Sequence, residues 1–159
     1  MHFIVDHHVD SNLYLETLKQ KDLKLIGSAC TLVCQKLLEH SQDSIDSDLA
    51  LFLSAPISLD SYNFTDHFYN SKWVDEDKQV FQELCLRNQD LQSDPEKYWK
   101  ILHESKQDIK ANLDLGCYAI FAKDLKNYEL LGEKSIGVAS AVVPLHLMIQ
   151  SFPDIVSEI

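Results

Sequence analysis

Three consecutive polar residues, Asp6, His7 and His8, follow a short apolar run near the start of the sequence. Neutral imidazole is a good ligand for manganese, zinc, cobalt or iron. A carboxylate beside it can bind the same ion or fix the tautomer of the imidazole. Because successive strand residues point to opposite faces, three polar residues in a row fit a loop just past a strand end. The tripeptide indicates a metal site, and a polar loop is the alternative.

The charge of the chain limits its partners. A net charge of -11 argues against nucleic acid, because proteins hold nucleic-acid phosphates mostly with Lys and Arg. An acidic protein can still act on a phosphate substrate if divalent cations lie between its carboxylates and the phosphate oxygens. A solvated acidic surface is the simpler alternative.

The elements around the tripeptide follow from the hydrophobic spacing. The run from Phe3 to Val5 predicts a buried parallel strand, and open α/β sheets place their chemistry at the carboxyl ends of such strands. We expect a short helix over residues 12–20 and a second helix opened by Ser28, whose side chain caps it. A further helix starts at Asp46 and carries residues 54–60 at its end, and we expect residues 57–60 to turn toward the same site.

The remainder of the chain predicts mainly helices. Residues 63–71 have the composition of a linker, and a helix with Val80, Phe81 and Leu84 on one face follows. Asp94 and Pro95 suit the start of another helix, and residues 98–113 are amphipathic. Residues 135–143 predict a strand, after which Pro144 opens a last helix.

Length and composition favour a packed globular protein of one ordinary domain or two small ones. No apolar run reaches the roughly 18 residues that a membrane span needs, and the N-terminus lacks the features of a secretory leader. We therefore expect no membrane partner and a cytoplasmic location. Cys30 and Cys34 lie one helical turn apart, and we expect all four cysteines to be reduced and structural rather than zinc ligands.

Several motifs follow one another along the chain. Residues 5–8 read Val-Asp-His-His, residues 27–31 Gly-Ser-Ala-Cys-Thr, and residues 53–60 end in Asp60. Residues 122–126, 134–140 and 142–145 form a later set. In this order they resemble the motifs of the DHH superfamily of phosphoesterases, in the branch of prune proteins and exopolyphosphatases, where a DHHA2 domain follows the DHH domain. The Ser-Arg-Lys-Lys run expected of family II pyrophosphatases is absent.

The resemblance implies an α/β fold, with part of a DHH domain and its parallel sheet over residues 1–70 and a partial DHHA2 domain over residues 71–159. It also implies hydrolysis of phosphoanhydride bonds in short inorganic polyphosphate or pyrophosphate, with Mn²⁺ or Mg²⁺, two ions in the full-length family. The implied metal ligands are His7, Asp60 and Asp6, and the implied catalytic contact to phosphate is His8. The implied substrate-binding residues are Lys123, Lys126 and Lys134; Lys123 and Lys126 fit solvated helix charges equally well.

The chain also departs from the family pattern. Two metal-binding motifs that normally precede the DHH motif are missing, and a DHHA2 domain usually continues further. These departures imply a chain truncated at both ends, inactive by itself. The alternative function is a non-catalytic, prune-like protein that acts by binding a protein partner. A nucleotide-directed phosphodiesterase is a third possibility, disfavoured because only four glycines are present and no Gly-rich substrate loop is found.

Overall fold

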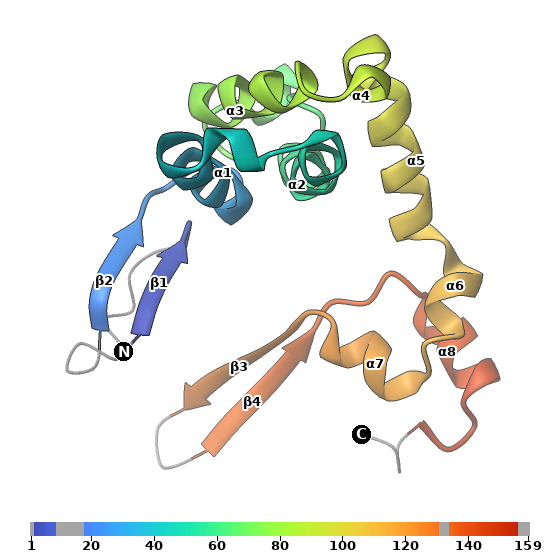
Figure 1. Ribbon diagram of the computed structural model, residues 1–159. Coiled ribbons are helices and arrows are strands. Elements are labelled where there is room, and N and C mark those ends of the chain that lie inside the picture. Colours follow the sequence, from blue (N-terminus) through green and yellow to red (C-terminus); the bar gives the residue numbers. More distant parts are fainter. Residues whose placement is uncertain (1, 9–17, 131–133, 156–159) are drawn as a thin grey trace. The chain divides into compact units, whose positions relative to one another are not determined.

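The structure of the protein is a computed structural model that describes residues 2–8, 18–130 and 134–155. The chain divides into two compact units, Met1–Leu102 and His103–Ile159. The fold is mixed α/β with a small parallel sheet, as the sequence predicts (Figure 1).

The parallel sheet belongs to the first unit and consists of β1 (His2–Asp6) and β2 (Leu18–Leu23). The predicted strand over residues 3–5 is confirmed as part of β1. The last residue of β1, Asp6, pairs with Leu23. The predicted helix over residues 12–20 is wrong for residues 18–20, which lie in β2; the rest of it falls outside the described residues. Leu, Lys and Gln are good helix formers, but pairing with β1 overrides that preference.

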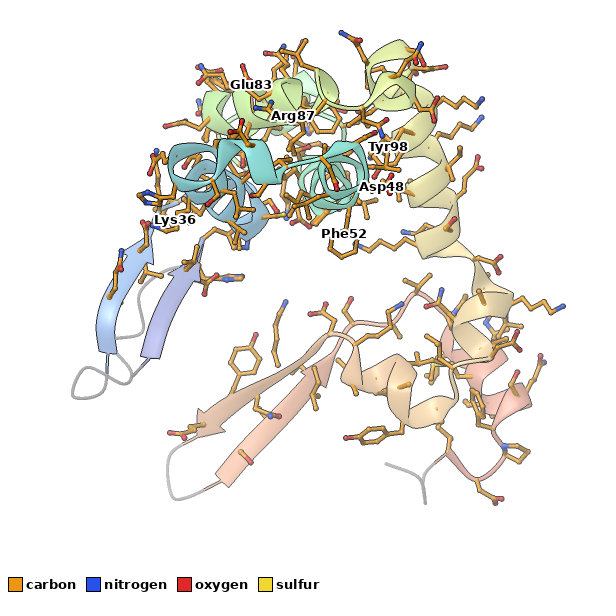
Figure 2. All side chains as sticks on the ribbon, viewed as in Figure 1. Lys36, Asp48, Phe52, Glu83, Arg87 and Tyr98 are labelled. Carbon is orange, nitrogen blue, oxygen red and sulfur yellow. The ribbon has the colours of Figure 1, made fainter. Side chains whose placement is uncertain are left out.

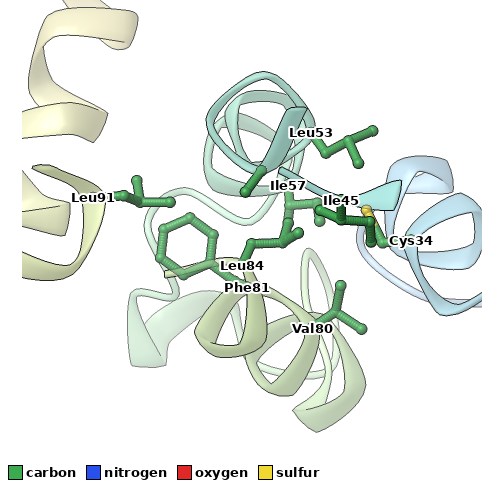
Figure 3. Close-up of a cluster of buried hydrophobic side chains, with 9 residues drawn as sticks. Cys34, Ile45, Leu53, Ile57, Val80, Phe81, Leu84 and Leu91 are labelled. Atoms are coloured by element: carbon green, nitrogen blue, oxygen red, sulfur yellow. The ribbon is translucent and has the colours of Figure 1, made fainter. Parts of the chain in front are cut away.

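Three helices follow β2 in the first unit: α1 (Ala29–His40), which contacts β1, α2 (Ser47–Asp60) and α3 (Asp75–Cys85). The Asp46 carboxylate accepts a hydrogen bond from the Leu49 amide at 2.8 Å, so the predicted start of α2 is confirmed. α2 continues through Pro56 to Asp60, so residues 57–60 form its last turn. The three helices share one apolar core (Figure 3), made of Cys34, Ile45, Ala50, Leu53, Ile57, Val80, Phe81, Leu84 and Leu91.

The segment between α2 and α3 is a packed turn rather than a linker. Tyr62, Asn63 and Phe64 have φ values of 50°, 54° and 56°, in the left-handed region. This turn reverses the chain and brings the Phe64 ring to within 5.6 Å of Trp73 and 5.1 Å of Phe81, between ring centroids. A 3-10 helix, η2 (Asp66–Phe68), completes the connection.

Polar contacts join the remaining elements of the first unit (Figure 2). Lys36 of α1 forms an ion pair with Asp22 of β2. α4 (Gln89–Ser93) leads to α5 (Pro95–Gln107), as the Asp94 and Pro95 pattern predicts. The Tyr98 hydroxyl of α5 donates a hydrogen bond of 2.7 Å to the Leu51 carbonyl of α2.

The second unit combines helices with a two-stranded sheet. α6 (Ile109–Leu113) and α7 (Cys117–Ala122) precede β3 (Leu125–Leu130), which pairs antiparallel with β4 (Lys134–Ala139). The predicted strand over residues 135–143 ends earlier than expected, at Ala139. Pro144 occupies the N-cap position of α8 (Leu145–Ser151), as predicted. A separate core contains Cys117, Ile120, Val143, Met148 and Ile155.

The division between the two compact units falls inside α5. The reason is that α3 packs against α1 and α2, which attaches residues 71–102 to the first unit. Within the described part of the chain, no helix is long and apolar enough to cross a membrane.

Cys30, Cys34 and Cys85 are free thiols, and Cys34 and Cys117 are buried. A side-chain hydrogen bond with Cys30, together with burial, raises the pKa of the Cys34 thiol. Cys34 therefore stays protonated and packs as a small apolar residue in the core.

Candidate metal centre

The candidate centre begins where β1 ends. The Asp6 carboxylate faces the two residues that follow it, and its Oδ1 accepts hydrogen bonds from the backbone amides of His7 at 2.7 Å and His8 at 3.4 Å. The same oxygen lies 2.8 Å from His8 Nδ1. Burial of the carboxyl works against ionisation, but the hydrogen bonds from the His8 side chain and the His7 amide outweigh it and lower the pKa of Asp6. Asp6 is therefore an ionised carboxylate.

The geometry around His7 fixes its tautomer. His7 Nδ1 lies 3.0 Å from the carbonyl oxygen of Ile26. A carbonyl oxygen can only accept, so we assign the ring proton to Nδ1. The lone pair of Nε2 is then available to a metal ion, the arrangement in which metal-binding histidines are commonly held by a backbone carbonyl.

Asp6, His7 and His8 together can hold a cation. Each offers one ligand atom, and these atoms lie within 4.8 Å of one another, with Asp6 and His7 half-buried and His8 exposed. Two imidazoles and a carboxylate suit manganese, iron, cobalt or zinc. The donor set of the described residues thus fits a divalent transition-metal ion, and the role of these residues as ligands stays a prediction.

Asp60 contacts the loop that also contacts His7, but through a different residue of that loop. It is the last residue of α2, and its Oδ2 accepts a hydrogen bond of 2.7 Å from the hydroxyl of Ser28. Among the described residues, Asp60 is not part of the 4.8 Å group formed by Asp6, His7 and His8. However, Ile26 and Ser28, which contact His7 and Asp60, are only two residues apart, so one short loop holds both predicted ligands.

The expected role of Ser28 needs correction. Ser28 occupies the N-cap position of α1, as predicted, but its side chain makes no capping hydrogen bond. Its hydroxyl donates to Asp60 instead. The helix start is held by Asp77, whose carboxylate accepts hydrogen bonds from the amides of Gly27 and Ser28 at 2.8 and 3.3 Å.

Asp77 is a residue that the sequence did not single out. It is fully buried, at 0% exposure, and also accepts from the Thr31 hydroxyl at 2.6 Å and from the Val74 amide at 2.9 Å. Asp77 lies in the first turn of α3, and this position predicts only its hydrogen bond with the nearby Val74 amide. The contacts with residues 27–31 have no local signal, because nothing distinguishes Asp77 from its acidic neighbours Asp75 and Glu76.

The three predicted substrate lysines all lie in the second unit. Lys123 follows α7, and its Nζ donates a hydrogen bond of 2.9 Å to Oδ1 of the buried Asn112. Lys126 lies in β3 and pairs with Asp124 at 3.4 Å. The backbone of Lys134 begins β4, and its side chain falls outside the described part of the structure. A substrate role for these lysines stays a prediction.

Comparison with known proteins gives a structural match. No family model matches the chain, and no curated protein matches it in sequence. A crystal structure of a Methanococcus jannaschii protein assigned to the family II inorganic pyrophosphatases matches with a TM-score of 0.69 and 20% sequence identity. The match covers 97% of this chain and 50% of that protein, so the chain spans about half its length. This similarity establishes the fold alone, which is that of about half of that protein.

Proposed function

We propose that the chain carries part of the active site of a metal-dependent phosphoanhydride hydrolase that acts on pyrophosphate or short inorganic polyphosphate. The observation that carries the proposal is His7 at the carboxyl end of β1, with Nδ1 turned to Ile26 and Nε2 available beside an ionised Asp6. The fold shared with a protein described as a pyrophosphatase supports the substrate class.

Each site residue has a distinct role in this proposal. His7 and Asp6 hold a Mn²⁺ or Mg²⁺ ion, with Asp60 as a further ligand oriented by Ser28. A divalent cation at such a site neutralises phosphate charge and lowers the pKa of water. His8 is held by Asp6 through Nδ1 and contacts a phosphate oxygen with the rest of its exposed ring. Lys123, Lys126 and Lys134 bind further phosphate oxygens.

The finer assignment rests on the sequence motifs. We propose that residues 1–70 correspond to part of a DHH domain and residues 71–159 to part of a DHHA2 domain, in the prune and exopolyphosphatase branch. A cytoplasmic location belongs to the same proposal.

The test combines binding with turnover on the full chain. Mn²⁺ binding is followed by loss of the free-ion signal in electron paramagnetic resonance, and phosphate release is followed with pyrophosphate and tripolyphosphate. The variants are His7→Ala and Asp60→Ala. Matched controls are His40→Ala at the exposed end of α1 and Asp48→Ala in the exposed first turn of α2.

Loss of binding and turnover in the first two variants, with both controls unchanged, supports the proposal. Binding that depends on His7 without turnover assigns the centre to a hydrolase whose remaining ligands come from outside this chain. Folded protein that neither binds Mn²⁺ nor releases phosphate contradicts the proposal and favours the non-catalytic, partner-binding alternative.

A further inference from the structure

We propose that Asp77 is a positioning residue for the candidate metal centre: its buried carboxylate fixes the loop of residues 26–28, and through that loop it orients His7 and Asp60. This inference deepens the proposed function and rests on it for the metal-binding consequence. Its effect on His7 is independent of any metal.

The first step of the argument is the chain of hydrogen bonds. Asp77 Oδ2 accepts from the Gly27 amide at 2.8 Å, and Asp77 Oδ1 accepts from the Ser28 amide at 3.3 Å. The loop fixed in this way presents its Ile26 carbonyl to His7 Nδ1 at 3.0 Å. Two residues later, the Ser28 hydroxyl reaches Asp60 at 2.7 Å. One buried carboxylate thus holds the backbone between the partners of two predicted ligands.

The second step is the unusual environment of the carboxylate. Asp77 has no exposed surface, and it accepts hydrogen bonds from three backbone amides and the Thr31 hydroxyl. No Lys or Arg is paired with it among the ion pairs of the described residues. A buried charge is costly unless hydrogen bonds compensate it. The three backbone amides and the Thr31 hydroxyl that donate to Asp77 are therefore held in fixed positions relative to one another.

The third step is the close packing of the loop. A Cβ atom on Gly27 would lie 2.3 Å from the Lys72 carbonyl oxygen, far inside van der Waals contact, and 3.0 Å from Asp77 Oδ2. The loop therefore runs directly against the chain that leads into α3. No empty space separates Gly27 from Lys72 and Asp77. A displacement of Asp77 or of the segment before α3 therefore also displaces Ile26 and Ser28.

The test uses the metal-free full chain and then adds Mn²⁺. Nitrogen-15 NMR reports the His7 tautomer at pH ~8.5, about two units above the ordinary imidazole pKa. Mn²⁺ affinity is measured by electron paramagnetic resonance, and folding by circular dichroism. The main variant is Asp77→Asn, which keeps the shape but replaces one acceptor oxygen by an NH₂ group. The control is Asp75→Asn, on the exposed face of the same helical turn.

We expect the wild type to hold its His7 proton on Nδ1 and Asp77→Asn to lose that preference. Mn²⁺ affinity should fall about tenfold, the lower end of what loss of a supporting partner causes. Asp75→Asn should change neither quantity. A purely structural role would lower stability and leave the His7 tautomer and Mn²⁺ affinity of the folded variant unchanged, and that result overturns the inference.

Two further arms keep the result decisive. If Asp77→Asn fails to fold, Thr31→Val removes one of the four hydrogen bonds, and an unchanged tautomer in that variant also overturns the inference. If the wild type binds no Mn²⁺ but the His7 tautomer depends on Asp77, the proposed metal function fails while the positioning role stands. If Mn²⁺ binds normally and the His7 tautomer is the same in the wild type and in Asp77→Asn, the positioning role is overturned and the proposed metal function stays intact.

Discussion

Replacing Ser28 by Ala tests the link between the ligand loop and Asp60. The substitution removes the hydroxyl that lies 2.7 Å from Asp60 Oδ2, and it removes no cap, because Ser28 makes no capping hydrogen bond. A hydrogen bond to a charged group contributes about 1.5–3 kcal/mol to stability. Asp60 is half-buried and partly solvated, so we expect a loss near the lower limit, about 1.5 kcal/mol. Loss of the orienting contact should also weaken Mn²⁺ binding by about tenfold.

Ser58→Ala is the matched control for this substitution. Ser58 is as buried as Ser28, lies on the same helix as Asp60, and its hydroxyl has no hydrogen-bond partner among the described residues. Removing an unpaired buried hydroxyl is neutral or stabilising. Urea denaturation measures the stability of each variant, and calorimetric titration measures Mn²⁺ binding. If Ser28→Ala matches Ser58→Ala in both measurements, the reasoning about Asp60 is wrong.

Three further predictions concern the core, the loop and the pH dependence. Leu84→Ala, at a fully buried position, should cost about 3–5 kcal/mol in urea denaturation, whereas Leu86→Ala, at 65% exposure, should cost under about 0.5 kcal/mol; equal losses would contradict the assigned core. Gly27→Ala should cost about 1–3 kcal/mol by overpacking against Lys72, and a Tm equal to that of the wild type would contradict this close approach. Burial raises the pKa of the Cys85 thiol from 9.0 to about 11, so its contribution to stability is complete below pH 9 and is lost as the pH rises toward 11; the decline in Tm over this range should be shallower in Cys85→Ala.

The elements that sequence reasoning can find are those with local signals. Asp46 caps α2, Asp94 and Pro95 start α5, and the spacing of Val80 and Leu84 gives the buried face of α3. In each case the signal in the sequence lies within a few residues along the chain. The strand β2 escapes such reasoning because its residue types favour a helix, and only its pairing with β1 makes it a strand.

The candidate site is predictable to the same extent. Asp6, His7 and His8 are adjacent in sequence, so their grouping needs only a strand end. The expectation that the Ser28 hydroxyl caps its helix is wrong, because a serine at an N-cap looks the same whether it bonds locally or to a distant carboxylate. Asp77 gives no signal, since its role depends on a partner segment about fifty residues away.

That separation has a consequence for the order of folding. Asp77 meets Gly27, Ser28 and Thr31 across 50, 49 and 46 residues of chain. Contacts this distant in sequence require closure of a long loop, whose entropic cost precedes any gain and slows their formation. In a refolding experiment, helical signal from α1 and α2 should therefore recover ahead of the His7 geometry. The ability to bind Mn²⁺ should return with the last step, when α3 docks and the first unit is complete.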